Sequence, residues 1–112
     1  MDISVRKQGA VQLMKLRGEL KLGDSVNQFR QTMEELIAAG DTNVVINLEE
    51  LRFMDSSGIG ALMRCFASAK QRSGNVKLVN PSKLVMQTLK LVSVLNLFEV
   101  FPDDAAAVGS FG

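Results

Sequence analysis

The chain has 112 residues, a length that suits one domain with a single modest core. Hydrophobic residues make up 46% of it and charged residues 22%, values that are ordinary for a globular protein and unlike those of disordered chains. The net charge is only +1 and there is no Trp or Tyr for base stacking, so we expect no nucleic acid partner.

Histidine is absent, and Cys65 is the single cysteine. These two facts exclude a Ser-His-Asp triad, a Cys-His pair, a histidine-ligated metal and a thiolate cluster. The sequence also has no glycine-rich phosphate loop. Only an enzyme that works with carboxylates, lysines or serines alone is left by these exclusions. Because most enzyme classes are excluded, we expect a protein that is not an enzyme and has no cofactor.

Two features predict the compartment. A lone cysteine forms no internal disulfide, which suits a reducing environment. The N-terminal residues do not resemble a signal peptide, and no apolar run approaches the roughly 18 residues of a membrane span. We therefore expect a cytoplasmic protein without membrane contact.

The first half of the chain predicts a hairpin followed by a helix. Apolar and polar residues alternate over 3–5, a turn fits at 8–9, and a second strand runs over 11–20. The alternation slips at Met14, which indicates either a bulge or a strand buried on both faces. Apolar residues then recur at helical spacing over 26–37.

The start and end of that first helix have their own markers. Ser25 and Gln28 fit a capping box, and Asp24 lies near the positive end of the helix dipole. Gly40 is suited to end the helix.

The middle of the chain predicts a buried strand and a second helix. The β-branched run at 44–48 is typical of a central strand, and a loop is expected over 49–54. The following helix should extend to about Ser73-Gly74, with Met63 on its buried stripe and Cys65 beside that stripe.

The next strand is predicted at 76–79, and Asn80-Pro81 should open a third helix. That helix is unusually apolar over 84–92. Part of it is expected to face a partner, although an imprecise boundary accounts for the pattern equally well.

A last short strand at 99–101 and a helical turn at 103–108 complete the pattern, followed by a loose tail at 109–112. Strands that alternate with helices predict an α/β fold: a small mixed, mostly parallel sheet of four to five strands with helices packed on it. Residues 1–112 should form one domain.

The segment 55–60, Asp-Ser-Ser-Gly-Ile-Gly, joins the carboxyl end of a buried strand to a helix, where α/β proteins commonly meet ligands and partners. Asp55 or Ser56 can cap that helix. Gly58 and Gly60 each cost about 1 kcal/mol in a helix relative to alanine, which indicates a close approach or an exposed backbone.

A serine at this position is well suited to phosphorylation. The phosphate adds a charge of about −1.5 to −2, which the helix dipole tolerates and a docked acidic or apolar partner does not. The plainer interpretation is that the tetrapeptide is only a helix cap.

The order and spacing of three segments, 18–20, 44–48 and 53–60, resemble the STAS domain family, and specifically the bacterial anti-sigma factor antagonists. The likeness extends from the first strand to residues 99–101. The Asp-Ser-Ser-Gly-Ile-Gly block is its most specific part.

The resemblance implies a partner-switching cycle. The unphosphorylated antagonist binds an anti-sigma factor that is an ATP-dependent serine kinase, and this frees the sigma factor. The kinase then phosphorylates Ser57, with Ser56 as the second choice, and a metal-dependent serine phosphatase resets the switch. ATP and metal belong to those partners, and a monomer is the default state for such a domain.

The resemblance also assigns roles around Ser57. Asp55 shapes the loop or presents the hydroxyl, and Asp24 matches an acidic position beside the same surface. Ser56 is the expected cap. Gly58 and Gly60 are expected to let the partner's active site approach the backbone.

Asn47 departs from the family pattern, which has an acidic residue there, and this predicts weaker phosphorylation or a retuned loop. Two other functions compete. A non-catalytic STAS scaffold or adaptor would use the apolar third helix. A nucleotide-binding module ranks last because residues 55–60 hold no basic side chain.

Overall fold

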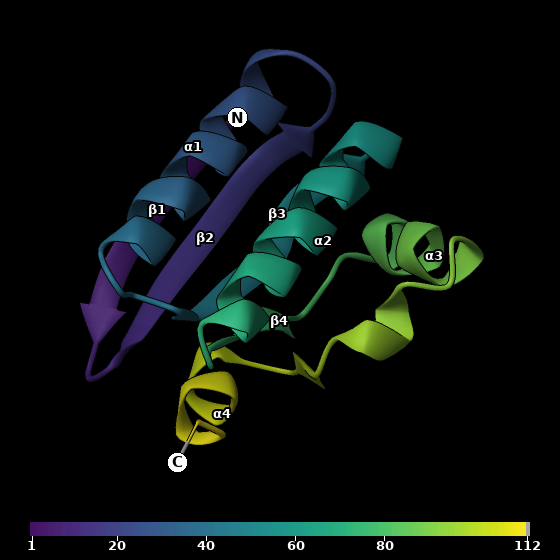
Figure 1. The fold of residues 1–112 in the computed structure, drawn as a ribbon. Coiled ribbons are helices and arrows are strands. Elements are labelled where there is room, and N and C mark those ends of the chain that lie inside the picture. Colours follow the sequence, from purple (N-terminus) through teal and green to yellow (C-terminus); the bar gives the residue numbers. More distant parts are fainter. Residues whose placement is uncertain (112) are drawn as a thin grey trace.

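The computed structural model describes residues 1–111 and shows a five-stranded sheet whose strand order follows the chain (Figure 1). β1 is antiparallel to β2, and the other neighbouring strands are parallel. The small, mixed and mostly parallel sheet is therefore confirmed. Its elements are β1 (Asp2–Gln8), β2 (Val11–Leu20), α1 (Asp24–Ala38), β3 (Asn43–Met54), α2 (Ser56–Gln71), β4 (Asn75–Val79), α3 (Lys83–Leu91), the 3-10 helix η1 (Leu95–Leu97), β5 (Val100–Phe101) and α4 (Asp104–Gly109).

The sheet is covered on both faces. Met14 and Ile46 point into the larger core, which α1, α2 and α3 close. Leu13 and Val45, one position earlier, point to the opposite face, where α4 buries Ala107 against them. Because successive side chains of a strand alternate between faces, β2 and β3 are buried on both sides. The slip in alternation at Met14 therefore reflects burial of both faces.

β3 is longer than predicted. The loop expected over 49–54 is wrong, because the strand continues to Met54 and stays paired with β2. The register between the two strands shifts twice along this length. Each shift adds a residue to β3, so the buried Leu48, Leu51 and Met54 follow at every third position instead of every second.

α1 begins at Asp24, earlier than a Ser25 cap implies, and it lacks the predicted capping box. The N-cap is Gly23, which supplies no side-chain acceptor. The Ser25 hydroxyl instead donates to the Lys21 carbonyl and accepts from the Lys21 amide, each at 2.9 Å. These bonds fix the loop that precedes the helix.

α2 presents a different face to the core than predicted. Cys65 is buried and Met63 is exposed, so both assignments were wrong. α2 packs against α1 as well as against the sheet, and the additional neighbour covers the side of the helix that carries Cys65. Burial raises the pKa of the Cys65 thiol to about 12, which keeps it protonated at neutral pH.

α3 starts later than predicted. Asn80 takes a left-handed conformation with φ 46°, and Pro81 precedes the helix instead of opening it. Ser82 is the N-cap: its hydroxyl accepts from the Val85 amide and donates to the Leu51 carbonyl at 2.9 Å. α3 is therefore tied to β3.

Several apolar side chains of the α3–η1 segment stay outside the core. Leu91 is 84% exposed, and Leu84, Val92 and Leu97 are about half exposed. A partner on this face stays a prediction.

α4 and the residues after it are held down by Lys77, whose side chain is almost fully buried. Its Nζ donates to the Ser110 hydroxyl at 2.7 Å and lies 4.2 Å from the centre of the Phe111 ring. The loose tail predicted for 109–112 is thus wrong for 109–111, and Gly112 lies outside the described residues.

Candidate functional site

Asp55 connects two helix starts. It is the N-cap of α2, and its Oδ1 accepts from the Gly58 amide at 2.9 Å. Its Oδ2 accepts from the Leu22 amide, also at 2.9 Å, in the loop between β2 and α1. The amide of Asp55 donates to the Leu20 carbonyl at 3.1 Å. One carboxylate therefore holds the loop before α1 against the first turn of α2.

The same bonds stabilise the charged form of Asp55. The Leu22 amide lowers the pKa of this carboxyl most, partial burial opposes it, and the amides of the first turn of α2 lower it further. The group is therefore a carboxylate at neutral pH, placed where the helix dipole favours negative charge.

Ser56 and Ser57 occupy the first two positions of α2. Ser56 is exposed and Ser57 is half-buried. The expectation that Ser56 caps the helix is wrong, because Asp55 takes that position. Within residues 1–111 neither serine hydroxyl makes a hydrogen bond, so neither is engaged by the fold.

The two glycines have different surroundings. A Cβ on Gly58 would lie 2.7 Å from the Leu20 carbonyl oxygen and 3.0 Å from Met54 Cγ. Gly58 is buried, so its need for glycine comes from close packing against β2, and the expected approach by a partner does not account for it. Gly60 is half-buried, and only the Arg64 side chain lies near it.

Asp24 lies at the same end of the molecule, since β2 and β3 are parallel and each leads directly into a helix. It is exposed and lines a shallow hollow with Glu19, Lys21 and Leu22. A shared partner-binding surface for Asp24 and Asp55 stays a prediction.

Leu22 was missed by the sequence analysis. Its side chain is 78% exposed, while its amide is bound to Asp55. An isolated apolar residue in the short polar loop between Leu20 and Asp24 was the available signal. It gives the surface beside Ser57 an apolar contact of its own.

Asn47 lies away from this surface. Because β3 runs on to Met54, roughly 20–25 Å of strand separate Asn47 from Asp55. Its Nδ2 donates to Asp104 Oδ1 at 2.8 Å, and its Oδ1 accepts from the Glu49 amide. Retuning of the switch loop by Asn47 is thus unsupported, and its side chain instead holds α4.

Residues 1–111 contain no group of three or more His, Cys, Asp and Glu side chains placed to hold a metal ion. None of their helices has the length and apolar character required to cross a membrane.

Removal of the Asp55 carboxylate is expected to be destabilising and pH-dependent. Asp55→Ala should lose about 1 kcal/mol near pH 7, because α2 loses its cap. The lowered pKa of Asp55 means that its contribution is complete above the ordinary aspartate range and is lost as pH falls through the folded-state value.

Urea unfolding of the wild type and Asp55→Ala at about pH 7 and about pH 2 measures this contribution. The difference between the two proteins should shrink at the lower pH. Asp24→Ala, which removes the carboxylate at the start of α1, is the matched control. A difference that does not change with pH would show that the charge of Asp55 is not the stabilising element.

Comparison with known proteins identifies the family to which the chain belongs. The STAS domain family model matches residues 2–107. An anti-sigma F factor antagonist from Paenibacillus polymyxa is 24% identical over 109 residues, which is 96% of this chain and 92% of that protein. A protein with the same description from Lysinibacillus sphaericus is 37% identical over 71 residues, 62% of this chain and 60% of that one.

Solved structures agree with this result. The phosphorylated form of the Bacillus cell fate determinant SpoIIAA superposes with a TM-score of 0.80 and 26% identity, over 99% of this chain and 100% of that one. A STAS domain protein from Planctomyces limnophilus gives a TM-score of 0.84 with 20% identity, over 100% of both chains. The family model covers nearly the whole chain and the fold agrees with the solved structures, so the chain belongs to the STAS domain family.

Proposed function

We propose that this protein is an anti-sigma factor antagonist whose binding to its partner is switched off by phosphorylation of Ser57. The observation that carries the proposal is the first turn of α2: Ser57 is half-exposed and its hydroxyl has no partner within residues 1–111, while Asp55 fixes the surrounding backbone. Relatives described as anti-sigma F factor antagonists support the choice of partner.

The fold tolerates a phosphate at this position. The first amides of a helix have no intrahelical acceptor, and the helix dipole favours negative charge there. Asp55 already occupies the Gly58 amide, so the cap does not depend on Ser57. The modification therefore changes charge at the surface with little change in backbone shape.

The proposed partner is an anti-sigma factor with serine kinase activity. In the transfer step Ser57 Oγ forms a bond to the γ-phosphorus of ATP held by the kinase, the bond to ADP breaks, and the hydroxyl proton passes to a base of the kinase. A serine phosphatase hydrolyses the ester and resets the switch. The antagonist itself supplies only the acceptor serine and its docking surface.

The docking surface combines charge with one apolar contact. Asp55 lies two residues before the serine and holds the loop that carries the exposed Leu22 side chain, and Asp24 follows Leu22 at the start of α1. Apolar contacts surrounded by polar groups are typical of the centres of protein interfaces. A phosphate on Ser57 would bring about two negative charges into such a contact, which costs affinity through repulsion and desolvation.

Phosphosite mapping tests the proposal. We expect that incubation with ATP and a lysate of the source organism places phosphate on Ser57 of the wild type. The phosphate should be lost in Ser57→Ala and kept in Ser56→Ala, since the family resemblance assigns modification to the serine directly before the glycine. Phosphate on Ser56 alone, or none while a control substrate is modified, would contradict the assignment. Mass spectrometry of the digested protein gives the readout.

A further inference from the structure

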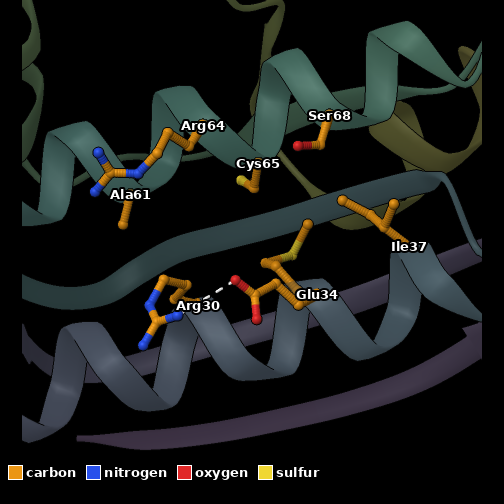
Figure 2. A pocket seen from close by; sticks show the side chains of 8 residues that line it. Arg30, Glu34, Ile37, Ala61, Arg64, Cys65 and Ser68 are labelled. Atoms are coloured by element: carbon orange, nitrogen blue, oxygen red, sulfur yellow. Dashed lines mark hydrogen bonds and ion pairs between the residues drawn. The ribbon is translucent and has the colours of Figure 1, made fainter.

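α1 and α2 enclose a groove (Figure 2). The groove holds a hollow of about 150 Å³, with Met33, Ile37 and Cys65 among its apolar lining. Two arginines, Arg30 from α1 and Arg64 from α2, stand at its mouth. The groove is therefore apolar inside and cationic at the opening.

The two arginines are engaged differently. Arg30 Nη1 lies 3.3 Å from Glu34 Oε1, one turn along the same helix. Arg64 makes no hydrogen bond or ion pair with any residue in 1–111, and no dashed line reaches it in Figure 2. One exposed guanidinium at the mouth of the groove thus has all its donors available.

Arg64 points toward the switch. Its side chain runs back along α2 past Ala61, toward the start of the helix (Figure 2). The guanidinium nitrogens lie 3.7 and 3.9 Å from the place that a Cβ on Gly60 would take, so they follow the helix surface one turn before Arg64 itself. This is the direction in which helical side chains project.

Ser57 lies on the same stripe of α2. Ser57, Ala61 and Arg64 are separated by four and three residues, the spacing that aligns side chains on one helix face. The Cα atoms of Ser57 and Arg64 are about 10.5 Å apart along the helix axis. The Arg64 side chain points toward the start of α2 and spans most of that distance. A phosphate ester on Ser57 would extend into the remaining gap.

We propose that Arg64 binds the phosphate of phosphorylated Ser57 and holds the modified switch against its own helix. The inference rests on the proposed role of Ser57. A planar guanidinium suits a phosphate because it donates two parallel hydrogen bonds to it. Arg64 then offsets part of the repulsion that Asp55 and Asp24 exert on the phosphate at this end of the molecule.

The test uses the full chain with phosphoserine inserted at position 57 during translation, so it needs no kinase. The second ionisation of a free phosphoserine has a pKa of about 6. Phosphorus NMR titration should show that Arg64→Gln raises this pKa by about half a unit or more, a threefold change in proton affinity, because the lost cation favoured the dianion.

Lys70→Gln is the matched control, since it removes one positive charge from the last turn of the same helix. Lys70 lies about 20 Å from Ser57, beyond the screening length at physiological salt. The charges of Asp24, Asp55 and Glu34 are the same in every variant, so the comparison isolates Arg64. Arg64→Lys keeps the charge without the planar fork and should give an intermediate pKa.

Equal phosphate pKa values in Arg64→Gln and Lys70→Gln would overturn the proposal. That result would leave the proposed function untouched, because phosphorylation by a kinase is not part of the experiment. Conversely, a lysate that never phosphorylates Ser57 would contradict the proposed function without affecting the measured contact. Thermal unfolding of the unmodified Arg64→Gln protein should match the wild type, since the side chain is exposed.

Discussion

Replacing Ser57 by aspartate is expected to weaken binding of the partner kinase at least tenfold. The new carboxylate lies at the start of α2, where the helix dipole accepts it, so the fold should keep its stability. At the docked surface the same charge must be desolvated beside Asp55. A loss of only about 1.4 kcal/mol is sufficient for a tenfold change in affinity.

Calorimetric titration with the kinase that modifies Ser57 measures this effect. Ser57→Ala is the matched control and should bind as the wild type does, because the hydroxyl makes no bond within residues 1–111. Urea unfolding of both variants separates binding from stability. A Ser57→Asp protein with wild-type affinity would rule out a switch that acts through charge.

Asn47→Asp, which restores the acidic residue that the family resemblance leads one to expect, should destabilise the protein by about 3 kcal/mol. Asn47 is almost fully buried, and its amide donates to Asp104 at 2.8 Å. A carboxylate there removes the donor and places two negative charges in contact. The loss should diminish at acidic pH, where one of the two carboxyls holds a proton.

The reciprocal substitution provides the control. Asp104→Asn added to Asn47→Asp exchanges donor and acceptor and should recover most of the lost stability in urea unfolding. If the double variant is as unstable as Asn47→Asp alone, repulsion is not the cause. The outcome also bears on phosphorylation, which neither change should affect because Asn47 lies far from Ser57.

The sequence correctly predicted the helices and strands whose hydrophobic periodicity is regular. The alternation in β1, the β-branched run at 44–48 and the helical spacing of α1 each identified the correct element. The end of β3 was missed because bulges changed its buried period from two to three and placed charges such as Glu50 between apolar residues. The burial of Cys65 depends on α1 beside α2, which no local pattern contains.

At the candidate site, local chemistry was predictable and long-range contacts were not. A cap at the start of α2 followed from residue types alone. The choice of Asp55 over Ser56 follows from the second bond that Asp55 makes, to Leu22, which lies 33 residues away in the chain. The steric clash that a side chain at position 58 would make involves the end of β2. This contact between distant segments likewise cannot be predicted from the local sequence.

The order of the strands in the sheet, which repeats their order in the chain, has a consequence for synthesis on the ribosome. Each strand pairs with the strand made just before it, so no later strand has to insert between two that are already paired. The sheet can grow from one edge to the other as the polypeptide emerges. α4 follows the five strands in the chain and closes over Val11, Leu13, Val45 and Val79, so the nascent chain keeps an apolar face open until α4 has left the exit tunnel.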